Sequence, residues 1–182
     1  VFDALKKSDY DTKGKFYLER YISAHSIMIA FEGVPAVYFN SLFGKSNDEA
    51  KYIITGNNRD INRYRWNQKV ILNHLKNSKS KQSIFYKSLT NLLSIRKKQK
   101  AFHPNAPRTT LNMGSKIFCF KRTSLDKKQT ILSITNLSHK TQNPKLNIKY
   151  TSWKNLIEPE IKFLNKKSFE LKPYETKWLS NI

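Results

Sequence analysis

The hydrophobic pattern of the sequence changes its period once, close to residue 101. Before that point, apolar residues recur at three- and four-residue spacing, as helices require, and beyond it short stretches alternate apolar and polar residues, as strands require. Pro104 and Pro107 stand at the change. A chain of 182 residues is long enough for one domain, or for part of a larger domain with a small module attached. We therefore expect two regions, 1–103 and 104–182.

The first region predicts a helix, a tight turn and a buried strand in succession. Apolar residues lie on several sides of Lys15–Phe31, which is typical of a well-buried helix. Gly33 follows as the residue that ends this helix. Residues 34–39 are rich in β-branched and aromatic residues and predict a strand, and Pro35 marks its start. A continuously apolar strand after a helix indicates a parallel sheet covered by helices.

A polar, turn-rich loop over residues 40–67 follows the predicted strand. A loop of this length is commonly functional, and in a β/α barrel such loops at strand ends form the active site. Helices are predicted near 67–75 and over 82–98, where Phe85 and Leu89 begin an apolar stripe at helical spacing.

The second region predicts a small antiparallel β-domain. Its turn residues include Asn143-Pro144 and Lys172-Pro173. The alternating stretches that predict strands are 117–120, 130–135, 145–150, 168–171 and 177–179.

The net charge of +21 favours an anionic partner at first sight. Lysine residues are scattered along the chain, however, and the short runs near 97–100, 127–128 and 166–167 are typical of solvated faces. The sequence shows no helix-turn-helix, zinc or RNP pattern, and no apolar run approaches the roughly 20 residues that span a bilayer. We therefore expect neither a nucleic-acid partner nor a membrane segment.

Several single residues invite a functional role and are better explained by packing. Cys119 lies in an alternating strand with no basic or histidine partner nearby, so we expect an inert buried thiol. None of the four histidines has metal-ligand spacing to another candidate ligand. His25 lies on an apolar helix, His103 is expected to pack at the junction of the two regions, and Trp153 and Trp178 are expected in the core of the sheet.

Four ordered motifs carry a family resemblance: Gly33–Gly44, Asn47-Asp48, Thr55–Arg63 and Gln99–Asn105. Together they resemble the sucrose phosphorylase branch of the α-amylase superfamily (glycoside hydrolase family 13), in its C-terminal part only. The resemblance implies the C-terminal portion of a TIM (β/α)8 barrel, that is, its last helix, strand, loop and helix units. A small antiparallel β-sandwich-like domain then follows. The resemblance is close over residues 1–107. Beyond them the chain resembles the family only in having a C-terminal β-domain.

The resemblance also implies a chemistry. A retaining enzyme of this kind needs an Asp nucleophile, a Glu acid/base and a second Asp that supports the transition state. In the family these carboxylates lie on earlier strands, so we expect no catalytic residue, no metal site and no cofactor in this chain. The chain alone is expected to be inactive, whereas the full-length enzyme would transfer glucose from a small α-glucoside to inorganic phosphate.

The sugar-binding residues that the resemblance implies are Arg59, Asp60, Asn58 and Asn62. Arg59 matches the arginine that binds hydroxyl groups of the donor glucose, and a rigid guanidinium offers paired donors to adjacent oxygens. A plain surface salt bridge is the alternative for this residue. Asp60 and Arg63 flank Arg59 and either brace the loop or touch sugar, while Asn58 and Asn62 cap turns or bind hydroxyl groups.

Two other functions stay open at this point. One is an α-glucosidase or other hydrolase of the same superfamily, and the other is a stand-alone basic β-module that binds carbohydrate or nucleic acid. Glucosylglycerate and sucrose-phosphate phosphorylases belong to the same branch, and this part of the chain does not separate them. We expect a cytoplasmic enzyme, and these residues leave its donor, acceptor and oligomeric state open.

Overall fold

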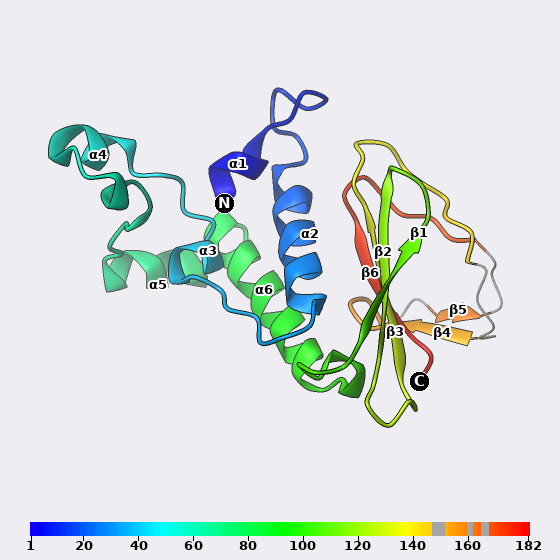
Figure 1. The fold of residues 1–182 in the computed structure, drawn as a ribbon. Coiled ribbons are helices and arrows are strands. Elements are labelled where there is room, and N and C mark those ends of the chain that lie inside the picture. The colour runs from blue at the N-terminus through cyan, green and yellow to red at the C-terminus, as the bar shows by residue number, and fades with distance from the viewer. Residues whose placement is uncertain (147–151, 160–161, 165–167) are drawn as a thin grey trace.

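The computed structural model describes residues 1–146, 152–159, 162–164 and 168–182, with helices in the first part of the chain and a sheet in the last (Figure 1). The helices are α1 (Phe2–Lys6), α2 (Tyr17–Ala30), α3 (Phe39–Leu42), α4 (Glu49–Thr55), η1 (Asn58–Asn62), α5 (Gln68–Lys76), α6 (Lys81–Lys97) and η2 (Lys100–Phe102). The strands are β1 (Arg108–Asn112), β2 (Ile117–Thr123), β3 (Thr130–Asn136), β4 (Ser152–Asn155), β5 (Lys162–Leu164) and β6 (Thr176–Ser180).

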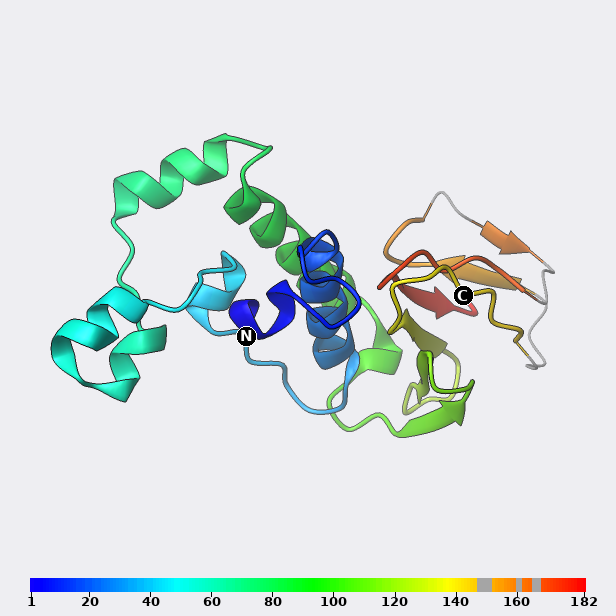
Figure 2. The ribbon, with the colours of Figure 1, turned by 90° about the horizontal axis from the view of Figure 1, so that it is seen from above.

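The three predicted helices are confirmed as α2, α5 and α6. Helix α6 begins where the Ser80 hydroxyl accepts a hydrogen bond from the backbone N–H of Ser83, which satisfies one of the free donors of the first turn. Phe85 and Leu89 of its apolar stripe are fully buried and share a core with α2. Figure 2, seen from above, shows that α4, η1 and α5 lie on the side of these helices away from the sheet.

The strand predicted over residues 34–39 is wrong. Residues 34–38 form no strand, and Phe39 already belongs to α3. The segment is extended at Tyr38, with φ −65° and ψ 141°, but none of the described residues pairs with it as a ladder neighbour. A strand exists only through its hydrogen-bonded neighbours, so an apolar, β-branched sequence without such a neighbour stays unpaired.

Among the described residues, six strands form one continuous antiparallel sheet in the order β1-β2-β3-β6-β4-β5. The sequence predicted a β-sandwich-like domain, whereas these strands belong to a single sheet. The strands predicted at 117–120, 130–135 and 177–179 are confirmed as β2, β3 and β6. The stretch 168–171 makes only isolated bridges, and of 145–150 all but the first two residues lie outside the described part.

Both faces of the sheet are covered, which explains why every residue of β3 is buried. Phe120, Ile131 and Trp178 face the helices and share one core with α1, α2 and α6. Cys119 and Leu132 point to the opposite face and belong to a second core. Helix α2 lies between α6 and the sheet (Figure 1), so the first core crosses from the helical region into the β-domain.

Two buried arginines, Arg96 and Arg122, fix the end of α2. A helix end leaves its last carbonyl groups without partners inside the helix, and these guanidinium groups supply donors. Arg96 donates to the carbonyl oxygens of Ile29, Phe31 and Gly33. Arg122 donates to the carbonyl oxygens of Ala30, His103 and Ala106, at 2.8, 2.7 and 3.0 Å.

Candidate functional site

An open hollow of about 400 Å³ lies where the extended segment before α3 meets η1. It brings Tyr38 together with residues some twenty positions further along the chain. Three of the four predicted sugar-binding residues line it, namely Asn58, Arg59 and Asn62, and Arg63 is the fifth lining residue.

The local fold of η1 places these residues side by side. Gly56 ends α4 in the left-handed conformation, with φ 62°. The Asn57 side chain then accepts a hydrogen bond from the backbone N–H of Arg59 at 3.0 Å, which starts the tight helix. Residues three apart in a 3₁₀ helix share one face, so Arg59 and Asn62 both face the hollow, consistent with its lining.

Asp60 has a different place from its neighbours and does not line the hollow. Its carboxylate forms an ion pair with the Lys51 ammonium at 3.2 Å. Hydrogen bonds from Thr55 and from Lys51 lower the pKa of Asp60 below its ordinary value. Of the two roles predicted for this residue, the geometry fits the one that braces η1 against α4.

The Arg59 guanidinium makes no ion pair and no side-chain hydrogen bond with any residue that the structure describes. Arg63 likewise forms no ion pair within the described part of the chain. The hollow therefore presents two guanidinium groups and two side-chain amides to solvent, and the Tyr38 hydroxyl at its edge donates to the Asn62 carbonyl oxygen at 3.3 Å. Such donors and acceptors suit a polyhydroxylated or anionic ligand.

One residue that the sequence did not single out bonds the backbone next to this hollow. Asn40, in α3, is 6% exposed. Its amide nitrogen donates to the carbonyl oxygens of Asn62 and Tyr64 at 3.2 and 3.1 Å, and its amide oxygen accepts from the Trp66 indole at 2.9 Å. Asn40 and Tyr38 both lie inside the first family-like motif, and that motif was the only sequence signal for them.

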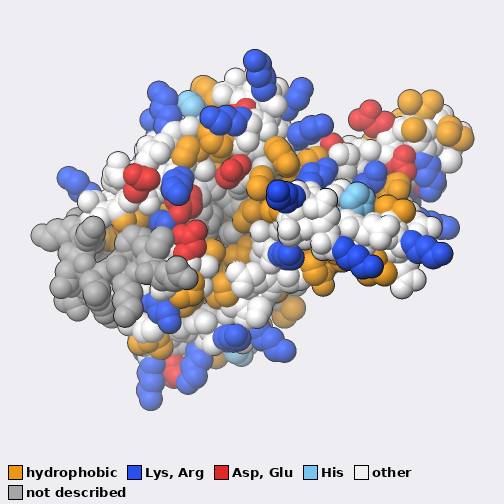
Figure 3. All heavy atoms as spheres, turned by 180° about the vertical axis from the view of Figure 1, so that it is seen from behind, with side chains coloured by type: hydrophobic (Ala, Val, Ile, Leu, Met, Phe, Trp, Pro, Cys, Tyr) orange, Lys and Arg blue, Asp and Glu red, His pale blue; other side chains and the backbone are white. Residues whose placement is uncertain are grey.

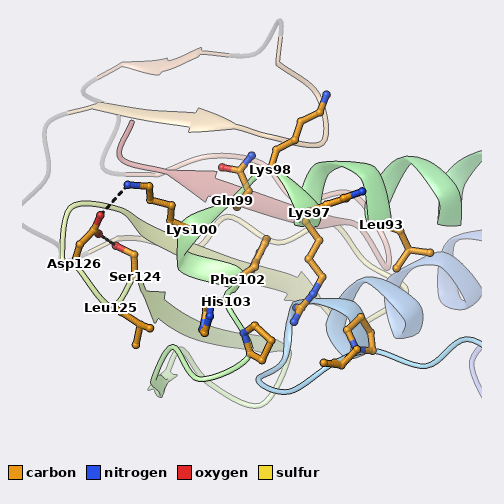
Figure 4. A pocket seen from close by; sticks show the side chains of 14 residues that line it. Leu93, Lys97, Lys98, Gln99, Lys100, Phe102, His103, Ser124, Leu125 and Asp126 are labelled. Atoms are coloured by element: carbon orange, nitrogen blue, oxygen red, sulfur yellow. Dashed lines mark hydrogen bonds and ion pairs between the residues drawn. The ribbon is translucent and has the colours of Figure 1, made fainter.

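A larger hollow, of about 680 Å³, lies where α6 and η2 meet the turn between β2 and β3 (Figure 4). Two of its charged groups pair with each other: Asp126 forms an ion pair with Lys100 at 3.0 Å and also accepts from the Ser124 hydroxyl at 2.6 Å. The Arg96 side chain is committed to the end of α2. His103 lines this hollow but is exposed, so its predicted packing at the junction of the two regions is wrong.

The other residues considered from the sequence have structural surroundings. Cys119 is completely buried, which confirms its predicted place in the core, and burial raises the pKa of its thiol to about 12. Trp153 and Trp178 are buried in the sheet, as expected. His25 is buried on α2, where its Nδ1 lies 2.9 Å from the Tyr21 carbonyl oxygen, and burial lowers its pKa.

Lysine and arginine side chains are spread over the whole face seen in Figure 3 rather than gathered into one stripe. In the part of the chain that the structure describes, no group of three or more His, Cys, Asp or Glu side chains could hold a metal ion. None of the described helices is long and apolar enough to cross a bilayer.

Comparison with solved structures defines the class of fold. The trehalulose synthase MutB from Pseudomonas mesoacidophila matches with a TM-score of 0.64 and 15% identity, over 88% of this chain and 38% of that chain. AmyP in complex with maltose matches with a TM-score of 0.67 and 14% identity, over 92% of this chain and 35% of that chain. The chain therefore has the fold of part of an α-amylase-family enzyme, with its C-terminal β-domain.

Sequence comparison adds relatives of one kind. Glucosylglycerate phosphorylase from Escherichia coli is 30% identical over 160 residues, which is 88% of this chain and 28% of the relative. The enzymes of that name from Allomeiothermus silvanus and Spirochaeta thermophila are 32% and 28% identical, over 61% and 66% of this chain and 20% of each relative. No family profile matches the chain.

Sequence and fold together confirm the predicted resemblance to the C-terminal part of an α-amylase-superfamily enzyme. The chain spans between 20% and 28% of the length of these relatives.

Proposed function

We propose that this chain is the C-terminal part of a retaining glucosyl phosphorylase and that its hollow at η1 forms one wall of the donor sugar site. The observation that carries the proposal is the Arg59 guanidinium, which pairs with none of the described residues and lines a hollow of about 400 Å³ beside two asparagine amides. A planar group with five fixed N–H donors can bond two adjacent sugar hydroxyl groups at once. The names of the three relatives support phosphorolysis as the reaction.

The reaction would proceed by two displacements at the anomeric carbon. A carboxylate attacks this carbon as the alcohol part of the donor leaves with a proton from the acid/base. A phosphate oxygen then displaces the carboxylate while the acid/base takes a proton from the phosphate. We place these carboxylates in a preceding part of a longer polypeptide. Arg59, Asn58 and Asn62 would bind and orient the glucosyl unit. The isolated chain would be inactive because it lacks these carboxylates.

The test uses the enzyme expressed from the complete open reading frame, with glucosylglycerate as the first donor, because the relatives carry that name, and sucrose as the second. We expect glucosyl phosphate to form only when inorganic phosphate is present. Arg59→Ala should lower turnover about a hundredfold or more, as the loss of a preorganised donor to the reacting sugar does.

Arg65→Ala is the matched control, because Arg65 is an exposed arginine in the same segment that does not line the hollow. Unchanged kinetics of Arg59→Ala would reject the role of this residue. Release of free glucose at the same rate with and without phosphate would favour the hydrolase instead.

A further inference from the structure

The segment that carries Arg59 is anchored at both ends by asparagine side chains. At its start, the Asn57 side chain caps η1 through the Arg59 backbone N–H. At its end, Asn40 reaches out from α3 and bonds the backbone of Asn62 and Tyr64. The two anchors bond the backbone at Arg59 and just after it, so they fix the backbone position from which the Arg59 side chain extends.

Few other side chains could make the three hydrogen bonds that Asn40 makes. A side-chain amide has two N–H donors and one carbonyl acceptor on a short stem. Both donors are used on the carbonyl oxygens of Asn62 and Tyr64, and the acceptor is used by the Trp66 indole, at distances between 2.9 and 3.2 Å. The side chain is nearly inaccessible to solvent, so no water can readily replace a lost bond.

The contacts of Trp66 extend this anchor into the helices. Its ring packs edge-on against Phe43 at 5.8 Å and against His74 of α5 at 6.2 Å. Phe43 in turn stacks on Tyr86 of α6 at 5.6 Å. The buried Asn40 amide thus connects the exposed hollow to helices α5 and α6 through Trp66 and Phe43.

We infer that Asn40 is a positioning residue for the sugar site: it touches no ligand, but it holds η1 so that Arg59 and Asn62 face the hollow. This inference rests on the proposed function, because that proposal makes the hollow a sugar site. The positioning itself can be measured without any ligand.

The discriminating change is Asn40→Asp, which has almost the same shape. The carboxylate still accepts from Trp66, but it turns two hydrogen bonds to carbonyl oxygens into two repulsive contacts. Asn91→Asp is the matched control, because Asn91 is an exposed asparagine on α6 and receives the same change in charge. Asn40→Ala removes all three bonds and serves as the second variant.

In ¹⁵N–¹H spectra of the ligand-free chain, we expect Asn40→Asp to move the backbone signals of residues 59–64 while the signals of the sheet stay in place. The indole N–H of Trp66 should remain hydrogen-bonded in Asn40→Asp, and its proton should exchange faster with solvent in Asn40→Ala. Asn91→Asp should leave residues 59–64 unchanged. Unmoved signals for 59–64 in Asn40→Asp, or a Trp66 indole that exchanges freely in the unmodified chain, would overturn the inference.

A titration with methyl α-glucoside links position to binding. It uses the enzyme expressed from the complete open reading frame, because the hollow is proposed as only one wall of the sugar site. Asn40→Asp should bind the sugar at least about tenfold more weakly than the unmodified enzyme, whereas Asn91→Asp should bind it equally well. Equal affinity of Asn40→Asp would overturn the positioning role. If the unmodified enzyme shows no binding, that result counts against the proposed function, and the ligand-free spectra still decide the role of Asn40.

Discussion

Replacing Arg122 by methionine should destabilise the whole chain. The completely buried guanidinium binds three backbone carbonyl groups that belong to α2 and to the segment after η2. Leaving a buried acceptor unpaired costs about 1–3 kcal/mol, so three of them correspond to about 3–9 kcal/mol. Burial, with repulsion from Arg96, lowers the pKa of Arg122 to about 10. Removing a cation from such surroundings offsets part of the loss, and we expect a net loss of about 3–5 kcal/mol.

Urea unfolding followed by tryptophan fluorescence measures this loss. With a slope of about 2 kcal/mol/M, the midpoint should fall by roughly 1.5–2.5 M. Arg108→Met is the control, because Arg108 lies on the neighbouring strand and forms a partly exposed ion pair with Glu32 at 2.8 Å. Such a surface pair is worth about 0–1 kcal/mol. If Arg122→Met unfolded at the same urea concentration as Arg108→Met, with the same slope, these carbonyl contacts would not hold α2 to the sheet.

Two further predictions concern the N-terminal loop and the turn after α3. Burial alone would raise the pKa of Asp11, but hydrogen bonds from the Phe16 backbone, Arg20 and the Lys15 backbone hold it at about 2, below the ordinary 3.8. This contribution is complete above about pH 4 and is lost as the pH falls through about 2. Asp11→Asn should therefore unfold at lower urea concentration than the unmodified chain at pH 6, and the difference should vanish near pH 2; a difference independent of pH would contradict the assignment. Gly44 and Gly56 both have positive φ, 57° and 62°, but a Cβ at Gly44 would lie 2.1 Å from an aromatic ring of α6, whereas nothing lies within 4 Å at Gly56. Calorimetry should give a loss of about 1 kcal/mol for Gly56→Ala and about 2–4 kcal/mol for Gly44→Ala, and equal losses would show that the close approach is absent.

The helices could be predicted because their signal is local. In α6, residues at positions 85, 89 and 92 mark one face, and the structure buries that face. β1 and β4 carry no comparable signal: Arg108–Asn112 is mostly polar and exposed, as an edge strand can be. The segment 34–38 fails in the opposite sense, because its composition fits a strand while its pairing depends on residues elsewhere.

The candidate site shows the same division. Asn58, Arg59 and Asn62 lie within five positions, so the short helix η1 gathers them at one hollow, and the sequence motif had singled out all three. Tyr38 and Asn40 reach the same place through tertiary contacts across more than twenty positions, at 3.3 and 3.2 Å from the Asn62 carbonyl oxygen. No local periodicity encodes such contacts.

The order of the sheet has a consequence for synthesis. Strand β6 is the last described strand in the chain, yet it lies between β3 and β4 and contributes Trp178 to the core that begins at Phe2. A nascent polypeptide that has exposed only its helices and first three strands would leave one edge of β3 open and one wall of α2 uncovered. Because Trp178 belongs to that core, the helical region can reach its final packing only after β6 has emerged from the ribosome. Non-local pairing of this kind is also slow.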